Sequence, residues 1–146
     1  MEKRNPKEWS CFIRTVRFGE TDAAGVVHFV ELFRWCHEAW EESLESYGIA
    51  LKAIFPTTQT SDGKIDFALP VVQCEANYFQ PLYVGDSIET ELYPEKINDS
   101  SFLIRFKFKK NGEQIGLVKI KHVSINPITR KKCSLSKEIN LWLESI

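Results

Sequence analysis

Asp22 is the one carboxylate in a run of small residues, 21–25, which lies between two largely apolar segments, 16–18 and 26–29. This order is typical of a strand end, a turn and the start of a long amphipathic helix. A carboxylate ahead of a helix N-terminus lies beside unpaired backbone N–H groups and the positive end of the helix dipole. Those groups stabilise an oxyanion, so a base or nucleophile at this place suits attack on a carbonyl. The segment therefore points towards acyl-transfer chemistry.

Asp22 also has a structural interpretation, because an Asp in a turn before a helix is commonly an N-cap or a plain loop residue. It is an imperfect cap candidate, since Gly25 and two valines separate it from Glu31, the first polar position of the expected helix. The residues alone leave both interpretations open.

The whole chain has the composition of one folded domain, which we expect to span residues 1–146. It has 146 residues, of which 43% are hydrophobic and 27% charged, and a net charge of −1. That balance gives no general attraction to nucleic acid or to acidic membranes. No apolar run approaches the roughly 20 residues of a membrane span, and the first residues lack the apolar stretch of a secretory signal. We expect no nucleic-acid partner, no membrane partner and a cytoplasmic location.

The cysteines at positions 11, 36, 74 and 133 are widely spaced, with no Cys-x-x-Cys pair and no histidine at zinc spacing. The sequence also lacks a phosphate-binding glycine-rich loop and a Gly-x-Ser-x-Gly elbow. We therefore expect free thiols, no metal and no cofactor.

The elements that must position Asp22 follow from hydrophobic spacing. A first strand is expected over residues 10–18 and a long helix over 27–47, with Gly48 as its stop. Apolar residues recur in that helix every three or four positions, at Phe29, Leu32, Phe33, Cys36, Trp40, Leu44 and Tyr47.

Residues 51–64 are expected to form a loop with room for a short helix, and beyond it the chain alternates as β-strands do. Period-two patterns cover residues 72–78 and 102–109, and Asn111-Gly112 predicts a tight hairpin into residues 114–126. Residues 136–146 are expected to form a short helix. One long helix followed by a meander of strands indicates the α+β class.

Several of these segments resemble a known family. The run 16–29, continued by Phe33-Arg34-Trp35 and by Tyr47-Gly48, resembles the opening signature of the 4-hydroxybenzoyl-CoA thioesterase family of hot-dog-fold enzymes. The likeness resumes at residues 69–79 and 85–86, so it covers most of the chain. Within the family, residues 21–27 and 36–39 are most similar to the cyanobacterial 1,4-dihydroxy-2-naphthoyl-CoA thioesterases of phylloquinone biosynthesis. The resemblance implies a hot-dog fold, an antiparallel sheet wrapped around one long central helix.

The resemblance also implies a catalytic site. Asp22 matches the family's catalytic carboxylate, either as a nucleophile that forms a mixed anhydride or as a general base for water, and both roles stay open. The backbone N–H of Phe29 matches the donor to the thioester oxygen. Gly25 would allow a positive φ or a close approach of substrate, or serve as a plain turn glycine. His28 replaces the family's usual aromatic residue and is either a hydrogen-bond donor to the acyl group or a partly exposed histidine.

Substrate contacts are implied farther along the chain. Phe33 and Pro70 are candidates for an apolar acyl pocket, although both suit a core equally well. Arg130 and Lys132 match family positions that contact the nucleotide of CoA, and phosphates need such cations; a short basic run is also typical of a solvated turn. The family's assembly implies a homo-oligomer, a dimer or a tetramer, with active sites at the subunit interface.

These expectations describe a thioester hydrolase that acts on an aromatic acyl-CoA, with 1,4-dihydroxy-2-naphthoyl-CoA as the leading candidate. One alternative is a broad thioesterase for short or medium acyl-CoAs. Another is a non-catalytic acyl-CoA-binding protein on the same fold. Asp22 argues against the latter, because simple binding needs no carboxylate beside the acyl carbon.

Overall fold

A computed structural model describes residues 5–55 and 67–146, and its centre is one long helix, α2 (Glu31–Tyr47). One face of this helix is buried and consists of Leu32, Trp35, Cys36, Ala39, Trp40 and Leu44. Gly48 ends the helix with a φ of 110°, a left-handed conformation that glycine adopts without strain. The predicted helix and its stop are therefore confirmed.

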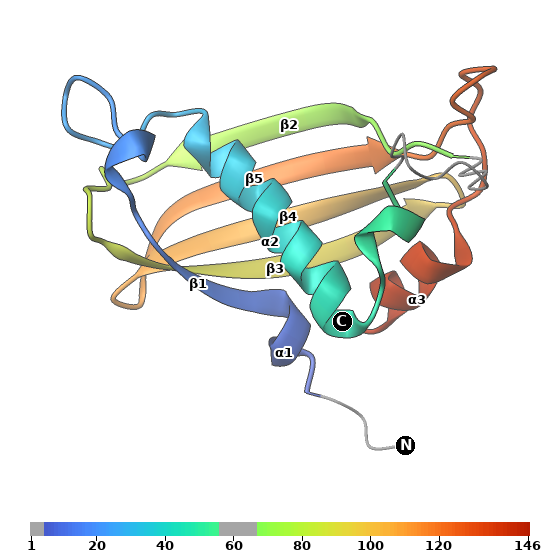
Figure 1. Ribbon diagram of the computed structural model, residues 1–146, viewed down its shortest axis with the longest axis horizontal. Coiled ribbons are helices and arrows are strands. Elements are labelled where there is room, and N and C mark those ends of the chain that lie inside the picture. Colours follow the sequence, from blue (N-terminus) through green and yellow to red (C-terminus); the bar gives the residue numbers. More distant parts are fainter. Residues whose placement is uncertain (1–4, 56–66) are drawn as a thin grey trace.

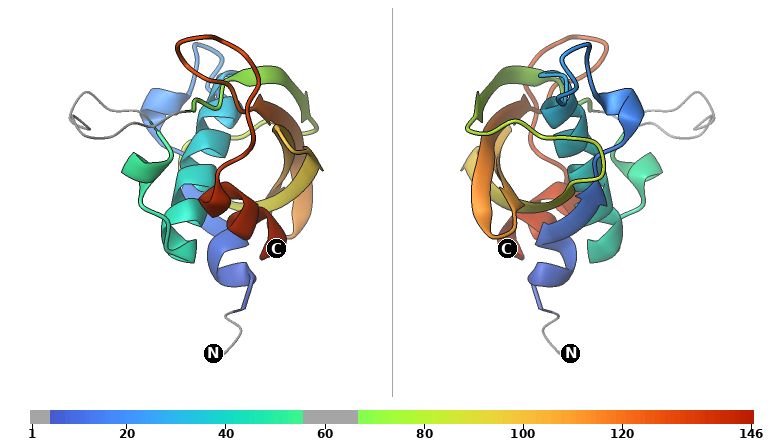
Figure 2. Two further views of the ribbon diagram at one scale, coloured as in Figure 1. Left: turned by 90° about the vertical axis from the view of Figure 1, so that its right-hand side faces the viewer. Right: turned by 90° about the vertical axis from the view of Figure 1, so that its left-hand side faces the viewer.

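A five-stranded antiparallel sheet curls around α2, as Figures 1 and 2 show. Alternate residues of its inner face, such as Phe102, Ile104, Phe106 and Phe108, pack into the core with the helix. This arrangement confirms the α+β class and the hot-dog fold. The strands are β1 (Cys11–Thr15), β2 (Val71–Tyr78), β3 (Ser87–Asn98), β4 (Ser101–Lys110) and β5 (Glu113–Val123), in the order β1-β3-β4-β5-β2.

Short helices at both ends of the described chain dock onto α2. α1 (Lys7–Ser10) and α3 (Lys137–Glu144) meet at Ser43, whose hydroxyl donates to the Trp9 carbonyl and accepts from the Trp142 indole N–H. The predicted C-terminal helix is thus confirmed. In the part of the chain that the structure describes, no helix combines the length and the apolar character that crossing a membrane requires.

The start of α2 differs from the prediction. The helix begins at Glu31, not at Val27, because Val27 forms an antiparallel bridge with Thr21, and a residue in such an extended pairing does not adopt the helical backbone conformation. The amides of Val27 and His28 donate to distant carbonyls, those of Leu82 and Glu20, each at 2.9 Å.

Other parts of the prediction differ as well. β1 ends at Thr15, three residues before the predicted end, because the chain turns into a 3₁₀ helix, η1 (Phe18–Glu20). The sequence analysis did not identify β3, although Ile88, Thr90 and Leu92 alternate there with polar residues as in a half-buried strand. Pro94 interrupts that pattern. It lies beyond the segment paired with β1, where β3 is an edge and tolerates a proline. Within the predicted loop over 51–64, residues 51–53 form a short helix, η2 (Leu51–Ala53), in line with the short helix expected there, and the part from 56 on lies outside the described residues.

Two positions in and next to the β4–β5 hairpin require glycine, one for its backbone conformation and one for its lack of a side chain. Asn111 and Gly112, with φ of 52° and 78°, make the predicted tight turn between β4 and β5. In β5, a Cβ on Gly116 would lie 2.9 Å from Leu32 Cδ2, so this glycine allows the first turn of α2 to approach the sheet closely.

Strand β2 stands apart from the other strands. It lies at an edge of the sheet and pairs on one side only, with β5. All of its residues are exposed except Ala76, which is half-buried. An edge strand that is bare on both faces is an unusual surface for an isolated protein.

His122 in β5 is a buried titratable group, with 2% of its surface exposed. Its ring lies 5.1 Å from that of Phe102 and 4.5 Å from that of Trp40, and Nδ1 donates to the Leu69 carbonyl at 2.9 Å. Burial lowers its pKa to about 4; the bond to Leu69 opposes the shift, and nearby His37 adds to it. His122 is therefore neutral in the folded protein at pH 7.

We predict a pH-dependent loss of stability from this histidine. An unfolded histidine has a pKa of about 6.5, so its neutral burial stabilises the fold fully above that pH, and the stabilisation is lost as pH falls towards 4. His122→Gln cannot take up this proton. Between pH 7 and pH 4.5, urea unfolding should show that the wild type loses roughly 2 kcal/mol more than the variant. Equal losses in the two proteins would assign the acid sensitivity to other groups.

Candidate active site

Asp22 lies in a loop, residues 21–28, that is folded tightly on itself. Thr21 and Val27 form an antiparallel bridge across it, and the Asp22 N–H donates to the Val26 carbonyl at 2.9 Å. Gly25 has a φ of 79°, the positive φ that the sequence analysis gave as one of its possible roles, and its N–H donates to the Asp22 carbonyl at 3.0 Å. The loop is therefore held by its own backbone.

The Asp22 side chain faces solvent and caps this loop, not helix α2. Its Oδ1 accepts the Ala24 N–H at 2.8 Å, and its other oxygen has no partner among the described residues. The N-cap position of α2 is Val30. The N-cap interpretation of Asp22 is therefore wrong for this helix, and one carboxylate oxygen is available to a substrate or a water molecule.

The amide of Phe29 lies between two amides that are already engaged. The His28 N–H donates to the Glu20 carbonyl, and the Val30 N–H donates to His28 Nδ1 at 3.4 Å. For the Phe29 N–H, the structure shows no acceptor within residues 5–55 and 67–146. Its side chain is 65% exposed and its carbonyl accepts the Tyr78 hydroxyl. A fixed, unengaged amide of this kind can donate to an oxyanion.

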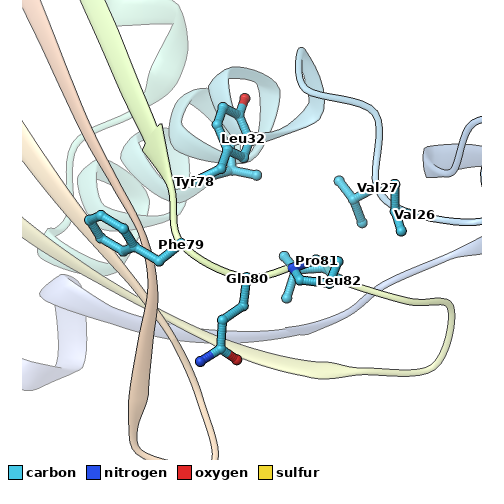
Figure 3. Close-up of a pocket in the computed structure, with 8 residues that line it drawn as sticks. All are labelled: Val26, Val27, Leu32, Tyr78, Phe79, Gln80, Pro81 and Leu82. Carbon is cyan, nitrogen blue, oxygen red and sulfur yellow. The ribbon is translucent and has the colours of Figure 1, made fainter.

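A cavity of about 320 Å³ opens beside this loop (Figure 3). Its size lies at the lower end of the range of about 300–1,000 Å³ for small-molecule sites, and its lining is mainly apolar, which suits a flat aromatic acyl group. Burial raises the pKa of the Tyr78 hydroxyl, and nearby Cys36 adds to the rise, so this group stays a hydrogen-bond donor at neutral pH. The lining residues are Val26, Val27, Leu32, Tyr78, Phe79, Gln80, Pro81 and Leu82.

The cavity differs in part from the pocket that the sequence suggested. Phe33 is half-buried and packs against the hydrophobic core, while residues 78–82 supply the wall. Tyr78 and Phe79, two aromatic residues where the alternating strand ends, were the available signal for this wall. No group of three or more His, Cys, Asp or Glu fit to hold a metal occurs within the described ranges.

The other predicted contacts lie at the opposite end of β2. Pro70 precedes that strand and its carbonyl accepts the Val123 N–H at 3.2 Å, whereas the cavity begins where the strand ends. Arg130, with a φ of 63°, and Lys132 are exposed in the loop that follows β5. Figure 1 shows that loop (orange-red) and the Asp22 loop (blue) at opposite ends of the molecule.

The eight residues of β2 separate the two groups. At about 3.3 Å per residue, the separation is roughly 25 Å. One chain therefore brings together Asp22, Gly25, His28 and Phe29 but not Pro70, Arg130 and Lys132.

Comparison with known proteins agrees with this architecture. Residues 16–143 match the family model described as the thioesterase-like superfamily. A 1,4-dihydroxy-2-naphthoyl-CoA hydrolase of Prochlorococcus marinus (strain NATL1A) is 78% identical over 98% of this chain and 95% of its own length.

Solved structures extend the likeness to three dimensions. A structure of a thioesterase described as putative, from Prochlorococcus marinus MIT 9313, is 46% identical with a TM-score of 0.93, over 97% of this chain and 98% of that one. A 1,4-dihydroxy-2-naphthoyl-CoA thioesterase from Synechocystis is 29% identical with a TM-score of 0.82, over 92% and 94% of the two chains. From its sequence match and its fold together, the chain belongs to the thioesterase-like superfamily.

Proposed function

We propose that this chain hydrolyses 1,4-dihydroxy-2-naphthoyl-CoA to the free acid and CoA. The observation that carries the proposal is the pairing of an accessible carboxylate, Asp22, with the unengaged Phe29 N–H beside an apolar cavity. Thioester hydrolysis needs a base or nucleophile, an oxyanion donor and a place for the acyl group, and these residues supply all three. The identity of the acyl group, 1,4-dihydroxy-2-naphthoyl, is taken from the names of the cyanobacterial relatives.

Two chemical routes fit the loop. In the first, the Asp22 carboxylate attacks the thioester carbon, the CoA thiolate leaves and takes a proton, and water hydrolyses the resulting mixed anhydride. In the second, Asp22 takes a proton from water as the water attacks the same carbon, and the thiolate leaves protonated. In both routes the carbonyl oxygen becomes negative and the Phe29 N–H donates to it.

The two halves of the predicted site meet only in an assembly. A two-fold axis that pairs β2 antiparallel with β2 of a second copy exchanges the two ends of the strand. The Asp22 loop of one copy then lies near the loop after β5 of the other. The bare edge and faces of β2 support this homodimer. Arg130 and Lys132 would bind CoA phosphates for the partner's site, and a tetramer would add a second such pair.

The cytoplasmic location favoured by the sequence stays a prediction.

The first test is Asp22→Asn, which keeps the size of the side chain and its bond to the Ala24 N–H but removes the charge. Loss of a general base alone should lower kcat about 10²–10⁴-fold. The free energy of unfolding should change by less than about 1 kcal/mol, because no helix cap is lost. Thiol release from 1,4-dihydroxy-2-naphthoyl-CoA measures kcat, and aliphatic acyl-CoAs in the same assay test the broad-thioesterase alternative.

The control is Glu8→Gln, which neutralises an exposed carboxylate on α1, on the side of the molecule opposite β2 in Figure 1, and should keep the wild-type rate. A well-folded Asp22→Asn protein with near-normal kcat would exclude both routes. A wild type that binds the acyl-CoA without releasing thiol would favour the non-catalytic alternative.

A second prediction concerns CoA. Replacing Arg130 and Lys132 with Ala should raise KM with a smaller effect on kcat, because remote phosphate contacts contribute mainly uniform binding. The rise in KM should shrink at high salt, which screens exposed charges. The control pair Arg105→Ala and Lys107→Ala removes the same charge from the outer face of β4; the neighbouring residues Ile104 and Phe106 are the ones that face the core. An equal rise in KM in the control would make the effect one of net charge.

A third prediction tests the shared site. The Asp22→Asn protein keeps its basic residues, and the Arg130→Ala, Lys132→Ala protein keeps its Asp22. Subunit exchange between the two should create mixed dimers with one intact site, so activity with the wild-type KM should return. Sedimentation should show at least a dimer at micromolar concentration. A mixture that behaves as the sum of its parts would place each site within one chain.

A further inference from the structure

A buried carboxylate that the proposed chemistry does not use lies two residues before Asp22. Glu20 is 5% exposed, and both of its oxygens accept hydrogen bonds. Oε2 accepts from the guanidinium groups of Arg14 and Arg34, the latter at 2.7 Å, and from the Trp35 indole N–H at 2.6 Å; Oε1 accepts the Arg17 amide at 2.8 Å.

Glu20 is ionised in this setting. Burial raises its pKa, but the Arg17 amide, the Trp35 indole and the Arg14 charge together outweigh burial and lower the pKa below its ordinary value. Arg14 belongs to β1 and Arg34 to α2, so one charge ties η1 to both elements. Removing one member of such a buried set leaves the others unpaired.

The backbone of Glu20 holds both ends of the Asp22 loop. Its carbonyl accepts the His28 N–H at 2.9 Å, directly before the unengaged Phe29 amide. The next residue, Thr21, forms the bridge to Val27. Wherever the Glu20 side chain is anchored, the carboxylate of Asp22 and the amide of Phe29 are placed with it.

We propose that Glu20 is a positioning residue, whose charge anchors the loop so that Asp22 and the Phe29 N–H keep a fixed relation to the acyl carbon. This inference rests on the proposed function and adds a residue to it. Glu20 itself does not touch the substrate. A purely structural Glu20 would contribute stability and leave the kinetics of the folded protein unchanged.

The chain offers a matched control in Glu38. Its carboxylate accepts from the same two arginines, Arg14 at 2.6 Å and Arg34 at 2.8 Å. It lies within α2, is 42% exposed and makes no hydrogen bond to residues 17–28 among the bonds of the described chain. Glu20→Gln and Glu38→Gln thus remove the same charge from the same arginines, but only the first releases the loop.

The kinetic test compares these two variants at a temperature at which thermal unfolding shows both to be folded. Glu20→Gln should lower kcat about 10²-fold with a much smaller change in KM, since small misplacements of reacting groups cost rate on this scale. Glu38→Gln should keep the wild-type kcat. If Glu20→Gln does not fold, Arg34→Gln, at a half-exposed side chain, takes its place with the same expected split between kcat and KM.

A second readout does not depend on turnover. Amide hydrogen exchange at His28 reports the bond to the Glu20 carbonyl, and it should become faster in Glu20→Gln but not in Glu38→Gln. A folded Glu20→Gln protein with wild-type kcat or wild-type exchange at His28 overturns the positioning role and leaves the proposed function intact. If the wild type hydrolyses no acyl-CoA, the proposed function fails, and unchanged exchange would then also reject the anchoring of the loop.

Discussion

The burial of α2 inside the curl of the sheet is the constraint on which the other features depend. Trp35 on the helix and Phe106 on the sheet are each 1% exposed, and burying such a side chain contributes about 1.5–3 kcal/mol. Packing of the helix against the sheet fixes the helix axis, so that Ser43 can form hydrogen bonds to both α1 and α3. The same packing also fixes the position of Leu32, which forms a wall of the cavity. The apolar core thus determines where the proposed chemistry can take place.

The loop before the helix is held by different forces. Its last two residues, Val27 and His28, donate backbone hydrogen bonds to the Leu82 and Glu20 carbonyls. Directional polar bonds fix orientation more sharply than apolar packing does, and proposed catalysis by Asp22 requires orientation. The protein therefore combines an apolar core, whose packing is not directional, with a cluster of hydrogen-bonded charges around Glu20, Arg14 and Arg34 at the start of α2.

The sequence predicts what local rules govern. Gly48 ends α2 and Asn111-Gly112 makes a hairpin because both depend on backbone conformations that only a few residues adopt easily. The start of α2 and the Glu20 contacts were not predictable in this way, since they join residues that are distant in sequence. Glu20 and Trp35 are 15 positions apart, and Val27 and Leu82 are 55 positions apart. Asp22 stood out from residue types and spacing, whereas the nucleotide-contacting residues came from the resemblance. Only the topology shows that β2 separates Arg130 from Asp22.

The close approach at Gly116 has a consequence for how relatives of this protein could diverge. A methyl group there would press on Leu32, and Leu32 forms part of the cavity wall. The volume of the cavity therefore depends on Gly116, a residue of the sheet that lies behind Leu32 and does not itself line the cavity. Selectivity for larger or smaller acyl groups could drift through such a position while Asp22 and its loop stay unchanged.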